Sequence, residues 1–138
     1  MTRRVYMDHT AGTPVDQRVL EAMMPYFSQK FGNPSSLHSW GNDARKAMEE
    51  ARTKIVGFVG ARKNEEIFFT SGGTESNNLA IKGTAYRNKD RGNHIVTTTI
   101  EHMSVMNPCK ALTKEGFSVD FVPVDKYGVV DLKGLEKA

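Results

Sequence analysis

The sequence has almost no cysteine: Cys109 is the single one among 138 residues. One thiol cannot form an internal disulfide, so a disulfide-stapled fold is excluded and the reducing cytoplasm is the expected location. Long apolar runs are also missing, because nowhere do the roughly 18 consecutive apolar residues of a membrane-spanning helix occur. The N-terminal stretch MTRRVYMDHT has basic residues but no apolar signal-peptide core after them. We therefore expect no membrane partner.

An excess of charge of one sign is missing as well. Lys and Arg total 19 against 16 Asp and Glu, a net charge of +3, and they are scattered along the chain. A nucleic-acid-binding arm would show a basic block, so we expect no nucleic-acid partner. The 4 histidines have no short ligand spacing and the cysteine stands alone. Zinc is therefore the weakest interpretation of these residues, and we predict no metal site.

The remaining composition, 38% hydrophobic and 25% charged, is that of an ordinary globular domain. In the first half, apolar residues at helical spacing predict helices over residues 17–27 and about 43–58, with Gly60 as the stop of the second. The second helix should bury one face, formed by Ala44, Met48, Ala51, Ile55 and Val59.

The pattern then alternates between the two kinds of element. Strand-like runs cover residues 65–70, 94–99 and 118–124, and helical patterns cover residues 75–88, 104–116 and 130–138. Pro108 fits the middle helix if that helix begins near Ser104 and the proline lies in its first turn. Strands that alternate with helices over short links predict βαβ units, and therefore an α/β fold with a mostly parallel sheet.

A Ser-Gly-Gly-Thr turn at residues 71–74 follows the first of these strands and opens a helix. Two glycines let the backbone approach an anion, the helix offers free N–H groups, and Thr74 adds a hydroxyl donor. The turn therefore suits a phosphate. It matches neither the P-loop nor the dinucleotide fingerprint. From these residues alone, a tight turn with a capping Thr74 is the simpler explanation, because short glycine-rich turns are common.

His102 follows the next strand along the chain. Parallel strands end at the same edge of a sheet, so the imidazole should reach a ligand whose phosphate lies at Thr74. A flat ring there could stack on a heteroaromatic ligand and exchange protons near neutral pH. A histidine that only makes hydrogen bonds at a strand–helix junction remains the alternative.

Several motifs together resemble one known family. VYMDHTAGTPVD, FGNPSSLHSWG, EEIFFTSGGTESNNLAIKG and HIVTTTIEHMSV occur in that order, followed by EGFSVDFVPVDKYGVVDLKGLEKA. In order and spacing they resemble the N-terminal part of cysteine desulfurases, the class V branch of the fold-type I pyridoxal phosphate enzymes. The resemblance implies that residues 1–138 form the N-terminal segment of one transferase large domain, with residues 1–15 as an N-terminal arm.

The resemblance also implies a function and a set of site residues. Cysteine desulfurases use pyridoxal 5′-phosphate to take sulfur from L-cysteine and release L-alanine. They act as homodimers and pass a persulfide to an iron–sulfur scaffold or another sulfur-acceptor protein, for cluster assembly or tRNA thiolation. The phosphate-binding turn falls on Gly73 and Thr74 here. The catalytic histidine that stacks on the cofactor ring falls on His102, and Asn33 and His38 lie in a segment that approaches the substrate.

Other parts of the family pattern have no counterpart in this chain. The Schiff-base lysine in Ser-x-His-Lys, the aspartate in Asp-Ala-x-Gln and the persulfide cysteine of a mobile loop are all missing. We expect Cys109 to be a buried helix residue instead. The sequence thus predicts a truncation, a domain fragment or one piece of a split desulfurase, inactive by itself. The alternative is a non-catalytic half-domain that binds a partner or a phosphate ligand.

Overall fold

A computed structural model describes residues 3–138 of the chain. The contacts within it form two compact units, the first ending at Phe68 and the second running from Phe69 to Ala138. The prediction that residues 1–138 are one segment of a single domain stays a prediction. Among residues 3–138 no helix has both the length and the apolar character that crossing a membrane requires.

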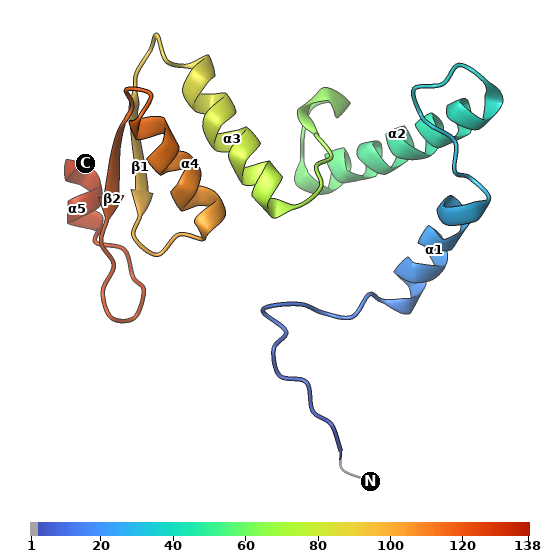
Figure 1. The fold of residues 1–138 in the computed structure, drawn as a ribbon, viewed down its shortest axis with the longest axis horizontal. Helices are drawn as coiled ribbons and strands as arrows, with labels where there is room; N and C mark the ends of the chain where they lie inside the picture. Colours follow the sequence, from blue (N-terminus) through green and yellow to red (C-terminus); the bar gives the residue numbers. More distant parts are fainter. Residues whose placement is uncertain (1–2) are drawn as a thin grey trace. The chain divides into compact units, whose positions relative to one another are not determined.

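The first unit contains the helices α1 (Gln17–Ser28) and α2 (Ser39–Val59) and a short 3-10 turn, η1 (Asn64–Glu66) (Figure 1). Both helices were predicted. α2 begins about four residues earlier than expected, because His38 caps its N-terminus by accepting a hydrogen bond from the backbone of Gly41. The predicted stop is confirmed: Gly60 has a left-handed backbone with φ of 69°, a conformation that glycine adopts without a steric penalty.

The predicted buried face of α2 is wrong. Of its five residues only Ala44 is buried, whereas Met48, Ala51, Ile55 and Val59 are exposed. A helix stripe becomes buried only when another element covers it, and within the first unit η1 is the main element that packs on α2. The spacing therefore predicted the helix correctly but not the surface that its apolar face contacts.

The strand predicted at residues 65–70 is also wrong. Its first residues belong to η1, and residues 67–70 have no strand partner among the described residues. Ile67 has an extended backbone, with φ of −105° and ψ of 121°, but its carbonyl accepts from the guanidinium of Arg52. A strand needs the backbone of a neighbouring strand for its hydrogen bonds, and no described strand lies beside this segment.

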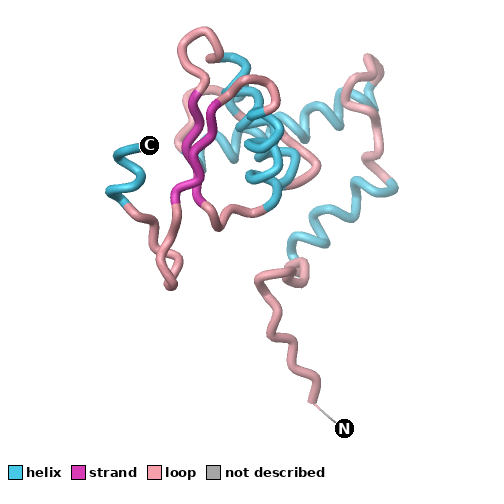
Figure 2. Tube along the Cα trace, turned by 60° about the vertical axis from the view of Figure 1, so that its left-hand side comes forward, coloured by secondary structure: helices cyan, strands magenta, loops and turns pink. Residues whose placement is uncertain are grey.

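The second unit is a βαβ unit preceded by one helix and followed by another. Its elements are α3 (Gly73–Arg87), β1 (His94–Thr98), α4 (Met103–Thr113), β2 (Ser118–Val122) and α5 (Leu132–Lys137). The two strands are parallel and pair in register, with His94 opposite Ser118. α3 and α4 lie on one side of the strand pair and α5 on the other (Figures 1 and 2). From α3 onward these elements confirm the predicted alternation, and they confirm the parallel pairing.

Two details of the second unit differ from the sequence-based expectation. β2 ends at Val122 rather than Val124, because Pro123 has no N–H to continue the ladder. α4 begins at Met103, so Pro108 is its sixth residue and lies in the second turn rather than the first. The proline therefore removes the hydrogen bond that the Ser104 carbonyl would receive in a regular helix.

The buried residues of the second unit gather where α4 meets α3 and β2. Leu112 is 0% exposed and packs with Ala85 and Phe117, while Cys109 is 1% exposed. The prediction that Cys109 is a buried helix residue is confirmed. Burial raises the pKa of its thiol, and the negative charge of Glu101 raises it further. A protonated, buried thiol is a poor nucleophile.

Candidate functional site

The glycine turn leaves open space above the start of α3. Gly72 is the N-cap and supplies no side chain, and Gly73 is the first helical residue. A Cβ placed on either glycine would meet no atom within 4 Å. Within the described residues, the hydroxyl of Thr74 and the first-turn N–H groups of Gly73 and Thr74 have no hydrogen-bond partner. A phosphate could therefore contact these donors directly.

The other end of the turn is already occupied by a side chain. Both the backbone N–H and the hydroxyl of Ser71 donate to one carboxylate oxygen of Glu75, at 2.6 and 2.7 Å. This contact resembles a capping box, in which a glutamate in the first turn reaches back to a free N–H. The anion site that the turn offers is therefore narrower than residues 71–74 and centres on Gly73 and Thr74.

The same contact predicts a pH dependence. The backbone hydrogen bond from Ser71, followed by that from its hydroxyl, lowers the pKa of Glu75 below its ordinary value of 4.5. Because the folded pKa is the lower one, the contact stabilises the turn fully above about pH 4.5 and is lost as the pH falls through the folded pKa. We expect the amide NMR signal of Ser71 to shift over that acid range and Glu75→Gln to abolish the shift. A Ser71 signal that titrates equally in the variant would contradict this.

His102 is the N-cap of α4, and one of its ring nitrogens is used for this. Nδ1 accepts from the backbone N–H of Ser104 at 3.1 Å and lies 2.8 Å from the Ser104 hydroxyl. The neutral ring then carries its proton on Nε2, which has no hydrogen-bond partner within residues 3–138. The side chain is exposed. His102 can thus contact a ligand with the rest of its ring while the N-terminus of α4 holds Nδ1.

Thr74 and His102 line the same hollow, between α3 and α4. Its volume is about 370 Å³, within the range of ligand sites. Most of its polar lining comes from amides, hydroxyls and one ammonium group; its residues are Thr74, Asn78, Lys82, His102, Met103, Ser104, Asn107, Pro108 and Ala111. The structure therefore brings together the two residues that the sequence associated with one ligand, although their roles remain predictions.

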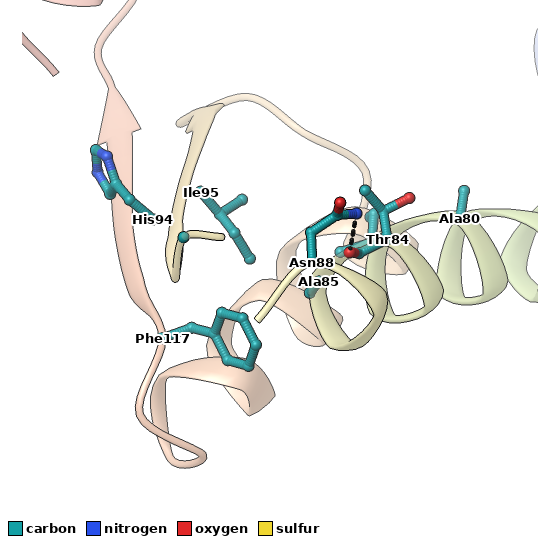
Figure 3. Close-up of a pocket in the computed structure, with 9 residues that line it drawn as sticks. Ala80, Thr84, Ala85, Asn88, His94, Ile95 and Phe117 are labelled. Atoms are coloured by element: carbon teal, nitrogen blue, oxygen red, sulfur yellow. Dashed lines mark hydrogen bonds between the residues drawn. The ribbon is translucent and has the colours of Figure 1, made fainter. Parts of the chain in front are cut away.

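A larger hollow, about 430 Å³, lies elsewhere in the second unit. Figure 3 shows it between α3 and the strands, with Ile95, Ala85 and Phe117 around it and the Asn88 amide bonded to the Thr84 carbonyl. His94 is its only titratable residue, and no predicted site residue contributes to it. Its mostly apolar lining suits packing rather than chemistry.

Asn33 and His38, the predicted substrate residues, lie in a well-braced loop of the first unit. The Asn33 side-chain oxygen accepts from the Ser35 N–H at 2.9 Å, and His38 Nδ1 accepts from the Gly41 N–H at 3.3 Å. The guanidinium of Arg45 donates to two loop carbonyls, at 2.9 and 3.1 Å. The loop is therefore ordered by its own contacts, and the substrate role of both residues stays a prediction.

Sequence reasoning missed several polar residues of the α3–α4 hollow. Thr74, Asn78 and Lys82 are spaced by four along α3, so they share one face of that helix. That spacing could have been found in the sequence, where only Thr74 was singled out. Ser104 and Asn107 could not, because the rotation of α4 decides which of its residues face α3.

Comparison with known proteins agrees with this geometry. The aminotransferase class-V family matches residues 5–138. The chain belongs to the class-V aminotransferase family. Over 138 residues it is 52% identical to the cysteine desulfurase IscS of Dictyoglomus turgidum, covering all of this chain and 35% of that protein. It is 54% identical over 132 residues to the cysteine desulfurase IscS 1 of Archaeoglobus fulgidus, covering 96% of this chain and 34% of that one.

Solved structures of this class superpose closely on the chain. A NifS-like protein gives a TM-score of 0.90 at 47% identity, covering 98% of this chain and 37% of that one. SspA in complex with cysteine gives a TM-score of 0.86 at 41% identity, covering 96% of this chain and 38% of that one. The apo cysteine desulfurase of Thermococcus onnurineus gives a TM-score of 0.82 at 36% identity, covering 96% of this chain and 33% of that one.

These relatives confirm the resemblance and the fold class: the chain is an α/β segment of the fold of the class-V desulfurases. Membership of the class-V family and the similarity to cysteine desulfurases also imply pyridoxal phosphate as the cofactor. The chain spans about a third of the length of the curated relatives it matches.

Proposed function

We propose that this chain forms the cofactor-phosphate and ring-stacking part of a pyridoxal phosphate-dependent cysteine desulfurase. In the whole protein the substrate is L-cysteine, the product is L-alanine, and the sulfur goes to an iron–sulfur scaffold or another sulfur acceptor. The proposal includes a homodimer, as the family resemblance implies. The activity belongs to the whole protein, because the family's lysine, aspartate and persulfide cysteine have no counterparts among these 138 residues.

The observation that carries the proposal is the shared hollow of Thr74 and His102. The residues fit a phosphorylated heteroaromatic ligand at two points. Free N–H groups at Gly73 and Thr74, with the Thr74 hydroxyl, suit the phosphate, and the exposed ring of His102 suits the flat pyridine. Lys82 adds a positive charge to the same hollow.

Each residue then has a distinct task in the proposed site. Gly73 and Thr74 bind the phosphate, and the positive end of the α3 dipole favours its negative charge. His102 orients the ring by stacking and holds a proton on Nε2. When bound, pyridoxal phosphate supplies an electron sink for reactions at the amino acid's α-carbon. Asn33 and His38 are proposed to contact the amino acid.

Binding of pyridoxine 5′-phosphate tests the phosphate site. This ligand has the ring and the phosphate but no aldehyde, so it cannot form Schiff bases with surface lysines. We expect Thr74→Val, which removes the hydroxyl and little volume, to weaken binding about tenfold or more, the loss expected for one hydrogen bond to a charged group. Calorimetric titration measures the affinity, and amide NMR shifts locate the site at Gly73 and Thr74.

Two controls make this measurement specific. Thr84→Val makes the same change on the same helix, away from the α3–α4 hollow, and should leave the affinity unchanged. Unphosphorylated pyridoxine should bind far more weakly than the phosphate ester, since it lacks the anion. If Gly73 and Thr74 stay still while other amides move, the phosphate site is assigned to the wrong residues.

A further inference from the structure

A chain of hydrogen bonds connects α3 to the ring of His102. The side-chain amide of Asn77, on α3, donates to the Ser104 hydroxyl at 2.8 Å. That hydroxyl lies 2.8 Å from His102 Nδ1, and the Ser104 backbone N–H points at the same nitrogen from 3.1 Å. Ser104 is buried, with 7% of its surface exposed, and Asn77 is half-buried. The three residues belong to two helices of one unit.

The direction of these bonds decides where the protons lie. An amide NH₂ and a backbone N–H are donors only, so the Ser104 oxygen accepts from Asn77 and His102 Nδ1 accepts from the backbone. The Ser104 hydroxyl proton is then directed to Nδ1. With its lone pair engaged, Nδ1 of the neutral ring stays without a proton, and Nε2 carries it. The imidazole therefore carries its N–H donor on the side of the ring away from Nδ1, and His102 lines the α3–α4 hollow.

We infer that Asn77 and Ser104 are positioning residues that fix the tautomer and ring orientation of His102. They hold it as an Nε2–H donor toward a hydrogen-bond acceptor on the ligand in the hollow. This inference rests on the proposed function only in placing a ligand beside His102; the tautomer itself is a property of the chain.

The first unit shows that helix capping alone does not require this arrangement. His38 caps α2 in the same way, with Nδ1 accepting from the Gly41 N–H at 3.3 Å, and no side-chain hydroxyl of residues 3–138 bonds to its ring. At His102 the cap is the same, but a buried serine and an amide from another helix are added. The Ser104 hydroxyl and the Asn77 amide are therefore not needed to cap the helix; their effect is on the His102 ring. His38 provides an internal control for it.

Solid-state NMR of the ¹⁵N-histidine-labelled chain measures the tautomer directly, because protonated and bare ring nitrogens have well-separated shifts. Magic-angle spinning tolerates association of the chain. There are only 4 histidines, and His102→Gln assigns the signal of interest. The wild-type ring, in its neutral form, is expected to be almost entirely Nε2–H. Ser104→Ala should change the tautomer ratio about fivefold, the effect expected for one net hydrogen bond.

Two further variants separate the hydroxyl's role from a packing effect. Asn77→Asp keeps the shape but replaces the donating NH₂ by an acceptor, which draws the Ser104 proton away from Nδ1; it should act like Ser104→Ala. Ser104→Thr keeps the hydroxyl and should restore the wild-type ratio. Asn88→Asp makes the same change at the C-terminal end of α3, outside the α3–α4 hollow, and should not alter the ratio. The His94 signal, bonded to Asp120 at 2.8 Å, reports that the unit stays folded.

The outcomes separate this inference from the proposed function. A His102 ratio that is the same in wild type, Ser104→Ala and Asn77→Asp overturns the inference, as does an equal change at His38. If the ratio responds as expected but pyridoxine 5′-phosphate fails to bind at Gly73 and Thr74, the proposed function fails and the positioning pair stands. If the ligand binds and Ser104→Ala weakens it about fivefold while Ser104→Thr does not, both are supported.

Discussion

Replacing Leu112 by alanine is expected to destabilise the second unit by about 2–5 kcal/mol. Leu112 is 0% exposed and joins Ala85 of α3 to Phe117, the residue just before β2. Few other side chains in this unit are buried, so little other apolar burial remains to offset the contacts that Leu112 loses. Against a typical total stability of about 5–15 kcal/mol, such a loss would leave the unit marginal. Urea unfolding, or amide hydrogen exchange in α4 and β2, measures it.

Leu132→Ala is the matched control for this prediction. Leu132 is also a helical leucine of the second unit, but 69% of its surface is exposed. Its removal should change the stability by no more than about 0.5 kcal/mol, as is usual for surface positions. Equal effects of the two substitutions would show that the small cluster around Leu112 does not hold the unit together.

Elements fixed by local pattern could be predicted from the sequence. The β-branched run at residues 94–98, the alternation at residues 118–122 and the glycine stop at Gly60 each depend on neighbours within a few residues. The parallel pairing of β1 and β2 also followed, because a helix between two strands leaves that as the favoured arrangement. For these elements local preference and the fold agree.

Features that depend on distant partners could not be predicted in the same way. Residues 65–70 have the composition of a buried strand, yet within the described chain no strand lies beside them. The apolar face of α2 has helical spacing, yet Met48 and Ile55 remain exposed. Composition reports that a residue favours burial; only the partner decides whether it is buried.

In the candidate site, too, residues in local motifs could be predicted, and residues that depend on packing between helices could not. Gly73, Thr74 and His102 could be singled out because a glycine turn before a helix and a histidine after a strand are visible as short motifs. Asn77 and Ser104 are separated by 27 positions, and their contact depends on how α3 and α4 are rotated against each other. No short motif encodes that rotation.

The chain of 138 residues is expected to associate with itself in solution. α1 has an apolar stripe with no cover: Leu20, Met23, Met24 and Phe27 are exposed by 40, 44, 55 and 70%. Phe58 of α2 is 90% exposed. Large contiguous apolar patches are rare on monomeric proteins and favour association, at roughly 25 cal/mol per Å² buried. Analytical ultracentrifugation should therefore show species heavier than the 15.4 kDa monomer, with a share that grows with concentration.

Substitutions in α1 test whether its stripe causes the association. Replacing Met23, Met24 and Phe27 together by glutamine should shift the sedimenting material toward the monomer, since it removes apolar area without adding charge. The control, Ser28→Gln, introduces an amide on the same helix but leaves its charge and the stripe intact, so it should sediment like the wild type. A wild-type chain that is monomeric and unfolds in one cooperative transition would instead mean that these apolar faces are tolerated in water. That result would also favour a self-sufficient, non-catalytic binding module over a segment of a desulfurase.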